Sequence, residues 1–136
     1  MLFITPFIGW FVSGVIKFII NYLKHGKNAK KMVGNGGFPS THTTVVVSTT
    51  AAIGFQGGFD TDIFALGVAF CFIVMLDAMG IRRALGEHAK DINNLNALKG
   101  NSSYKQHREK QGHSRIEVLG GIGVGIIVGW IVSLLF

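Results

Sequence analysis

The sequence predicts an all-α, polytopic membrane protein with four transmembrane helices and a cytoplasmic amphipathic helix. Residues 1–16, 32–59 and 118–136 contain no charged residue, and residues 63–81 contain only Asp77. A bilayer span needs roughly 20 largely apolar residues, so four spans would use roughly 80 residues. Charged residues make up only 15% of the chain, against about 25% in soluble domains. We therefore expect one membrane-embedded domain over residues 1–136.

The basic residues predict the orientation of these spans. The chain has 13 Lys and Arg against 7 Asp and Glu, a net charge of +6. Twelve of the 13 fall in two stretches, one between the first and second apolar segments and one between the third and fourth. The positive-inside rule then places both stretches in the cytoplasm and both termini outside, in the inner or plasma membrane. Nucleic acid is not an expected partner, because no basic helix or aromatic platform stands apart from the membrane.

The first half of the chain predicts two helices joined by a glycine-rich turn. The first covers residues 2–23 and contains a single charge, Lys17. The turn at residues 34–37 ends the following basic loop, and Pro39 suits the first turn of the second helix, where its missing N–H costs nothing. The second helix covers residues 40–55. It is dense in Thr, Ser, Ala and Val, so it should face other helices more than lipid.

The second half predicts a long third helix and a glycine-rich fourth. The third begins near Thr61 and continues past Gly80 as an amphipathic extension over residues 81–98, and its apolar stripe consists of Leu85, Ile92, Leu95 and Leu98. The fourth begins near Ser114. Gly121, Gly125 and Gly129 recur every four residues along it and form a face suited to close helix packing. Such faces also favour a homo-oligomer.

Three polar clusters stand at the cytoplasmic ends of the predicted helices. The first is the run from Gly36 and Gly37 through Ser40 to His42. A glycine-rich turn that leads into a helix N-terminus directs backbone N–H groups at one spot and can bind phosphate. Ser40 could donate its hydroxyl there, and His42 could donate or accept a proton. The alternative is an ordinary helix cap.

The second cluster pairs a histidine with a carboxylate. His113 and Glu117 are four residues apart and share one helix face. A carboxylate that holds one ring nitrogen leaves the other free to act as a nucleophile or base. A salt bridge at the start of a helix is the alternative interpretation.

The third cluster is cationic. Lys17 lies in an apolar helix, where a charge should face a polar interior, and Lys24 follows two turns later. Arg82 and Arg83 come after Asp77, which needs a partner within its span. Asp77 could serve catalysis or an ion pair between helices, and one of the arginines could instead reach the lipid headgroups.

Together these clusters resemble the type 2 phosphatidic acid phosphatase superfamily, and most closely its divergent branch of acid phosphatase/vanadium-dependent haloperoxidase-related membrane proteins. The superfamily pattern is Lys-x6-Arg-Pro, then Pro-Ser-Gly-His, then Ser-Arg-x5-His-x3-Asp. Lys17 and Lys24 match the first block with Lys for Arg, and Pro39 to His42 match the second with Thr for Gly. His113 and Glu117 match the end of the third. His107 stands at its Arg position, so Arg108, Arg82 or Arg83 would supply that charge.

The resemblance implies a metal-independent lipid phosphatase without a cofactor, whose substrate is a membrane lipid such as phosphatidic acid, phosphatidylglycerophosphate or a prenyl diphosphate. His113 would form a phosphohistidine, Glu117 would orient its ring and His42 would protonate the leaving group. The phosphoryl oxygens would be held by Lys17, Lys24, Ser40, Arg82 or Arg83 and the amides of Gly36 and Gly37. The alternatives are a non-enzymatic membrane scaffold or oligomer that binds anionic lipid, and a haloperoxidase.

Overall fold

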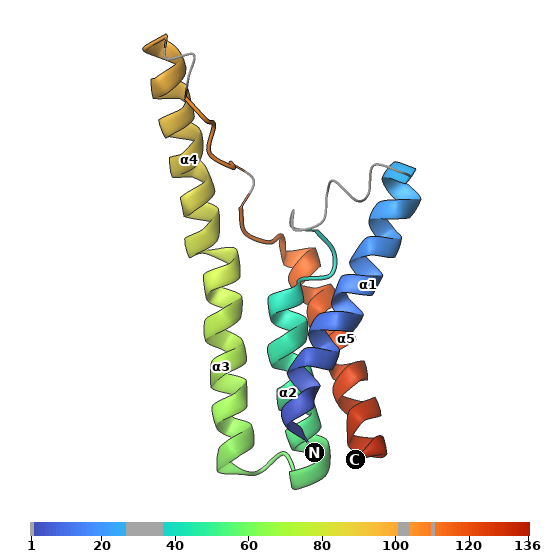
Figure 1. The fold of residues 1–136 in the computed structure, drawn as a ribbon. Helices are drawn as coiled ribbons and strands as arrows, with labels where there is room; N and C mark the ends of the chain where they lie inside the picture. The colour runs from blue at the N-terminus through green and yellow to red at the C-terminus, as the bar shows by residue number, and fades with distance from the viewer. Residues whose placement is uncertain (1, 27–36, 101–103, 110) are drawn as a thin grey trace.

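The computed structural model describes residues 2–26, 37–100, 104–109 and 111–136. All regular elements in these ranges are helical, as predicted (Figure 1). In chain order they are the 3₁₀ turn η1 (Leu2–Ile4) and the helices α1 (Thr5–His25), α2 (Thr41–Gly57), α3 (Asp62–Met79), α4 (Ile81–Leu98) and α5 (Arg115–Leu135).

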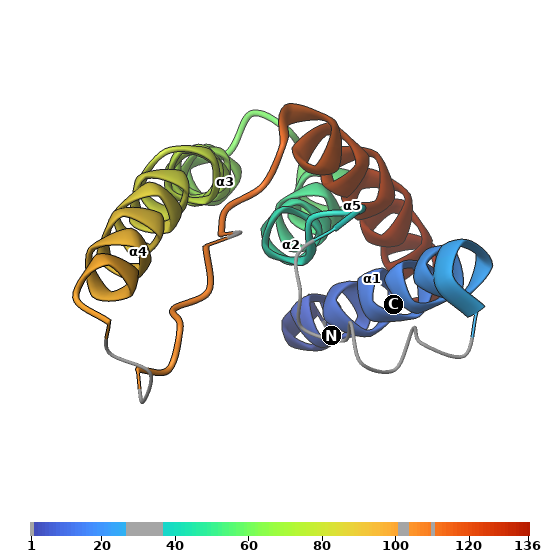
Figure 2. The same ribbon diagram turned by 90° about the horizontal axis from the view of Figure 1, so that it is seen from above.

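Helix α2 is the centre of the arrangement. Helices α1, α3 and α5 all pack against it, and the view along the bundle places it between them (Figure 2). The two ends of the chain and the α2–α3 turn lie at one end of the bundle, whereas α2 and α5 begin at the other end, where α3 passes into α4 (Figure 1). This topology brings the start of α2, the start of α4 and the start of α5 together.

The interior of the bundle is small and polar, and its outside is apolar. The buried residues of α2 are Thr43, Thr44, Ser48, Thr50, Ala51, Ala52 and Gly54. Large apolar side chains such as Trp10, Phe72 and Trp130 lie instead on the outer surface. Water would penalise such a surface and lipid would not. The chain is therefore built as a membrane protein.

Of the four predicted spans, three are found as candidate membrane spans among the described residues. The segments Leu2–Lys24, Asp62–Leu98 and Arg115–Leu135 are long and apolar enough to cross a bilayer. Helix α2 has only 17 residues, and many of them are Thr, Ser and Ala that pack inside the bundle rather than face lipid. Its role as a fourth span stays a prediction, as does the orientation of the bundle.

The glycine repeat of α5 brings this helix very close to α2. A Cβ built on Gly129 would lie 2.6 Å from the carbonyl oxygen of Ser48, and one on Gly121 would lie 2.7 Å from that of Ser40. Glycine therefore lets the two backbones touch, which confirms close packing through this face. Because α2 occupies the face within the same chain, the predicted homo-oligomer draws no support from it.

Two helix starts follow the sequence closely, and a third differs by one position. Ser114 caps α5 and Thr61 caps α3. At α2, the Oγ of Ser40 accepts a hydrogen bond from the backbone N–H of Thr43, so Ser40 is the cap and the helix begins at Thr41. Pro39 therefore precedes the helix instead of lying in its first turn, because a capping serine stands between them.

The predicted extension exists as α4, but its packing face is not the apolar stripe. Leu85, Ile92, Leu95 and Leu98 are all exposed. The buried residues of α4 are Gly86, Ala89 and Asn93, and Gly86 and Asn93 contact the chain segment that leads to α5. Small and polar residues give no apolar periodicity, so the sequence pattern did not reveal this contact.

Candidate active site

A cavity of about 240 Å³ lies where the three helix starts meet. Its walls come from α1, from the first turns of α2 and α4, and from the segment that precedes α5. The lining side chains are mostly cationic or polar: Lys17, Thr41, His42, Arg82, Arg108, Gln111, Gly112 and His113. Sequence-distant members of the three predicted clusters therefore share one cavity.

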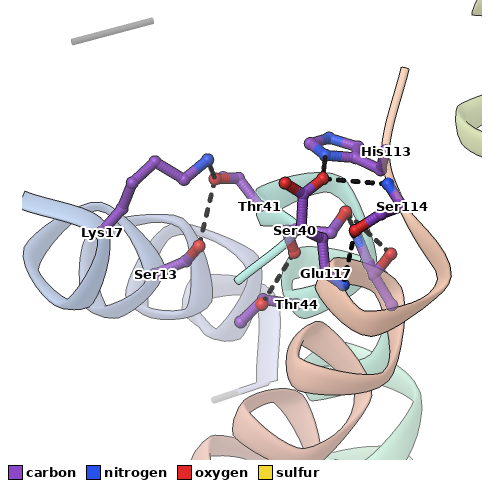
Figure 3. A network of polar contacts seen from close by, with 9 residues as sticks. Ser13, Lys17, Ser40, Thr41, Thr44, His113, Ser114 and Glu117 are labelled. Carbon is purple, nitrogen blue, oxygen red and sulfur yellow. Dashed lines mark hydrogen bonds and ion pairs between the residues drawn. The ribbon is translucent and has the colours of Figure 1, made fainter. Parts of the chain in front are cut away.

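The predicted His113–Glu117 pair forms, but not along one helix face, because His113 precedes the cap Ser114 and Glu117 lies in the first turn of α5. His113 Nδ1 lies 3.1 Å from Glu117 Oε2, and the two side chains are only 8% and 19% exposed. The same Oε2 accepts the backbone N–H of Ser114 at 3.0 Å, which completes a capping box at the start of α5 (Figure 3). When Nδ1–H donates to the carboxylate, Nε2 keeps its lone pair for a ligand in the cavity.

The backbone of Glu117 ties this pair to α2. Its carbonyl oxygen accepts the backbone N–H of Ser40 at 2.8 Å, and Ser40 is fully buried beneath the start of α2. The start of α5 is thus fixed to the start of α2, and the position of His113 relative to His42 follows from that bond. The two rings lie with their centroids 5.9 Å apart.

Lys17 lines the cavity and is hydrogen-bonded to a hydroxyl, that of Thr41, which the sequence analysis did not identify. Its Nζ donates to Thr41 Oγ1 at 3.0 Å, and Ser13 Oγ, one turn earlier on α1, donates to the same oxygen at 3.0 Å (Figure 3). Thr41 stands where the superfamily pattern has glycine. Its hydroxyl therefore orients the lysine, a role that glycine has no atom to perform.

His42 lies in the first turn of α2, outside the three candidate spans. Partial burial, followed by the positive charges of Arg82 and neighbouring His113 and Lys17, lowers the pKa of its ring below the usual value. Both causes disfavour the charged imidazolium. His42 is thus more often neutral than an isolated histidine would be.

Two arginines contribute to the cavity. Arg82 donates from Nε to Asp77 Oδ2 at 3.1 Å, and this pair is about two-fifths exposed. The bond uses one edge of the guanidinium and leaves its terminal nitrogens to line the cavity. Arg108 enters from the segment before α5. The sequence offered three candidates for the arginine of the phosphate site. Arg82 and Arg108 line the cavity, whereas Arg83 is exposed and does not.

Helix α4 holds the segment that carries Arg108. Asn93 is buried, donates to the carbonyl oxygen of His107 at 2.8 Å, and accepts the backbone N–H of His107 at 2.8 Å. Further along, Gly112 has φ +82° and a Cβ built on it would lie 3.0 Å from the backbone N of Arg83. Only glycine fits this close approach without strain, and it lets His113 donate its backbone N–H to Ala78 at 3.0 Å.

The remaining predicted residues lie beside the cavity or away from it. Ser40 caps α2, Asp77 holds Arg82, and Glu117 stands behind His113. Lys24 and Gly37 do not line the cavity, and Gly36 lies outside the described residues. Sequence reasoning missed Gln111 and the positioning roles of Thr41 and Asn93, which become visible only when the three helix starts converge. In the described chain, no group of three His, Cys, Asp or Glu side chains is gathered as for a metal ion.

The fold and this cavity define a helical membrane protein with a histidine–carboxylate pair facing a cationic hollow. A family model described as the Divergent PAP2 family matches residues 1–128, and the chain belongs to that family. It is 31% identical to an uncharacterized membrane protein, YuiD, of Bacillus subtilis strain 168, over 90% of this chain and 87% of that protein. No solved structure matches. The predicted resemblance is confirmed at the level of the family.

Proposed function

We propose that this protein hydrolyses a phosphate monoester or diphosphate of a membrane lipid through a phosphohistidine on His113. One observation carries the proposal: the ring of His113 is held at Nδ1 by Glu117 and lines a cavity together with Lys17, His42 and Arg82. A nucleophile, a group that orients it, a proton donor and cations around one hollow are the parts that phosphoryl transfer requires. Membership in the Divergent PAP2 family supports the same chemistry.

In the first step, Nε2 of His113 attacks phosphorus while the bond from phosphorus to the leaving oxygen breaks. This oxygen belongs to an alkoxide in a monoester and to a lipid phosphate in a diphosphate. The leaving oxygen takes a proton from His42, and the negative carboxylate of Glu117 stabilises the charge on the His113 ring. Lys17, Arg82 and Arg108 neutralise the phosphoryl oxygens. A bound phosphate group would also favour the charged form of His42, which burial and the charge of Arg82 disfavour.

In the second step, water attacks phosphorus and gives a proton to His42, which the first step left neutral. The N–P bond breaks, phosphate leaves and the neutral ring of His113 is restored. The step needs no further reactant. Thr41 contributes by holding the ammonium of Lys17 at the cavity wall.

The decisive experiment measures phosphate release by the purified protein in detergent. The substrates are phosphatidic acid, phosphatidylglycerophosphate and a prenyl diphosphate. His113→Asn should lower release by at least about 10³-fold, because it removes the nucleophile. His88→Asn serves as the matched control, since His88 is exposed on α4 and does not line the cavity.

Two further readouts separate this mechanism from lipid binding alone. Vanadate, which adopts the five-coordinate geometry of the phosphoryl transition state, should inhibit the wild type, and brief reaction should leave an acid-labile phosphate on it but not on His113→Asn. Release from none of the three lipids, together with binding to anionic vesicles, would favour the non-enzymatic alternative. Bromide oxidation with vanadate and peroxide would instead indicate a haloperoxidase.

A further inference from the structure

An apolar groove of about 430 Å³ runs along α2 and α3 on the side where α1 lies. Its walls contain hardly any polar surface, in contrast to the cationic cavity. The lining residues are Pro6 of α1, then Val45, Val46, Thr49, Thr50 and Ile53 of α2, and Ile63, Leu66, Gly67 and Phe70 of α3. The groove therefore lies in the apolar part of the bundle.

The groove is open toward the surroundings of the bundle. Helices α1 and α3 each pack on α2, but they make no substantial contact with each other among the described residues. Figure 2 shows them on different sides of α2. Leu66 on the α3 wall is 71% exposed. In a membrane, this opening would face the lipid chains directly.

Both walls of the groove lead to the cationic cavity. On α2, Val45, Val46 and Thr49 continue at helical spacing from His42, which lines the cavity. On α3, Leu66 and Phe70 share a helix face with Asp77, which lies two turns beyond Phe70 and is hydrogen-bonded to Arg82. A chain lying in the groove would thus reach the cavity between His42 and Arg82.

A second apolar groove, of about 420 Å³, lies on the other side between α2, α3 and α5. The backbone crosses the end of this second groove that lies nearer to the cationic cavity. His113 donates its N–H to the carbonyl oxygen of Ala78 at the end of α3, and two residues later the chain enters α5. Among the described residues, such a backbone bond joins α3 to the segment before α5, whereas none joins α3 to α1, on whose side the first groove lies.

We infer that the opening between α1 and α3 admits the lipid substrate from the bilayer, and that the groove below it holds one hydrocarbon chain while the phosphate occupies the cationic cavity. This inference rests on the proposed function and names its substrate class, a long-chain lipid phosphate. From His42 to Ile53 is eleven residues along α2, or about 16 Å at the helical rise. That depth is about half of a bilayer's hydrocarbon core of about 30 Å, so the chain of one leaflet fits.

The test uses a series of single-chain phosphates: butyl, octyl, dodecyl and hexadecyl phosphate. The readout is the ratio of kcat/KM for hexadecyl to that for butyl phosphate. In the wild type kcat/KM should rise along the series by at most about fourfold for each added methylene, the limit set by full burial of the group, and should level off once the groove is filled. The hexadecyl-to-butyl ratio should therefore be well above one.

Two variants act on the groove and one acts elsewhere. Leu66→Trp fills the groove and should reduce the hexadecyl-to-butyl ratio by at least tenfold (about 1.4 kcal/mol in ΔG‡). Phe70→Ala removes part of the wall and should lower the ratio less. Leu119→Trp is the matched control, because Leu119 is 66% exposed on α5 and lines neither groove, so its ratio should equal that of the wild type.

The outcomes separate this inference from the proposed function. If release depends on His113 but the ratio stays near one, or if Leu66→Trp and Leu119→Trp change it equally, the groove does not bind the chain and the proposed chemistry still stands. If no phosphate in the series is hydrolysed in a His113-dependent way, both ideas are overturned. Hydrolysis of butyl phosphate by Leu66→Trp shows that this variant has folded.

Discussion

Helix α2 makes two very different contacts with its neighbours. Against α5, the two backbones approach closely, because Gly121, Gly125 and Gly129 place no side chain of α5 between the helices. Against α3, side chains make the contact: a Cβ built on Gly67 would lie 2.9 Å from the Thr50 side chain, and one built on Gly54 would lie 2.8 Å from the ring of Phe64. Apolar hollows lie on both sides of Thr50.

The difference separates a rigid part of the bundle from an accessible one. The α2–α5 contact fixes the starts of both helices, and these carry His42 on one side and His113 with Glu117 on the other. Phosphoryl transfer needs such groups held with little freedom. The α2–α3 side leaves volume for a ligand, and its polar end bears Arg82. The size of the facing residues therefore decides both properties: it fixes the helix starts at the α2–α5 contact, and it leaves room for a ligand beside the α2–α3 contact.

The largest effect is expected from a side chain placed in the tight contact. In Gly129→Leu, the new Cβ would collide with the Ser48 carbonyl oxygen and with Ala51. Overpacking of this kind usually costs about 1–3 kcal/mol, and here the neighbouring atoms include backbone that cannot turn away. Thermal unfolding in detergent should show a clearly lower Tm and loss of any phosphate release.

The control for that variant is Gly123→Leu on the same helix. A Cβ on Gly123 meets nothing within 4 Å, so the added side chain faces open space and the Tm should stay near that of the wild type. An equal fall in Tm for both variants would mean that glycine content, and not the α2–α5 contact, determines the stability of α5.

A smaller effect is expected at the polar end of the same contact, in Glu117→Gln. Glutamine can keep the capping box at Ser114, so folding and Tm should change little. It removes the negative charge beside His113, and residues that orient a histidine in comparable pairs contribute about 10- to 100-fold. We expect kcat to fall by that factor. Glu117→Ala should lower both kcat and the Tm, because it also removes the hydrogen bond from the Ser114 N–H in the capping box. A Gln variant with full activity would make Glu117 a structural residue only.

The smallest effect is expected on the accessible side, in Asp77→Asn. The Asp77–Arg82 pair is partly exposed, and such pairs contribute at most about 1 kcal/mol. We therefore expect a rise in KM of at most about fivefold, with kcat nearly unchanged, because Arg82 loses its anchor but keeps its charge. Asp91→Asn, at an exposed position on α4, should have no effect. A large fall in kcat for Asp77→Asn would assign Asp77 a direct part in the chemistry.

Much of the fold could be predicted because its signals are local. Uncharged runs indicated the apolar helices, Ser114 and Thr61 marked helix starts, and the four-residue glycine spacing indicated a close contact. The sequence predicts that α2 begins at Ser40, whereas the helix begins one residue later, at Thr41. Pro39 and Ser40 both suit a helix start, and only the hydrogen bond from the Thr43 N–H to Ser40 decides between them. The packing face of α4 was missed because Gly86 and Asn93 carry no apolar signal.

The candidate site was predictable in part. The four-residue spacing predicted that His113 pairs with Glu117, and the two side chains lie 3.1 Å apart. The predicted shared helix face is wrong, because His113 precedes the cap of α5. The choice among arginines did not follow, because Arg82, Arg83 and Arg108 differ only in where the chain turns them. The partner of Lys17 was likewise hidden, since Thr41 lies 24 residues away in sequence.

By itself, the sequence determined the class of protein, the helices and the chemical groups that gather at one end of them, because apolar length, caps and helical spacing are properties of neighbouring residues. The tertiary structure alone decided which of those groups share a cavity and where the bundle stays open. Both depend on how closely helices distant in sequence approach one another, and that distance is set by the side chains of two helices together.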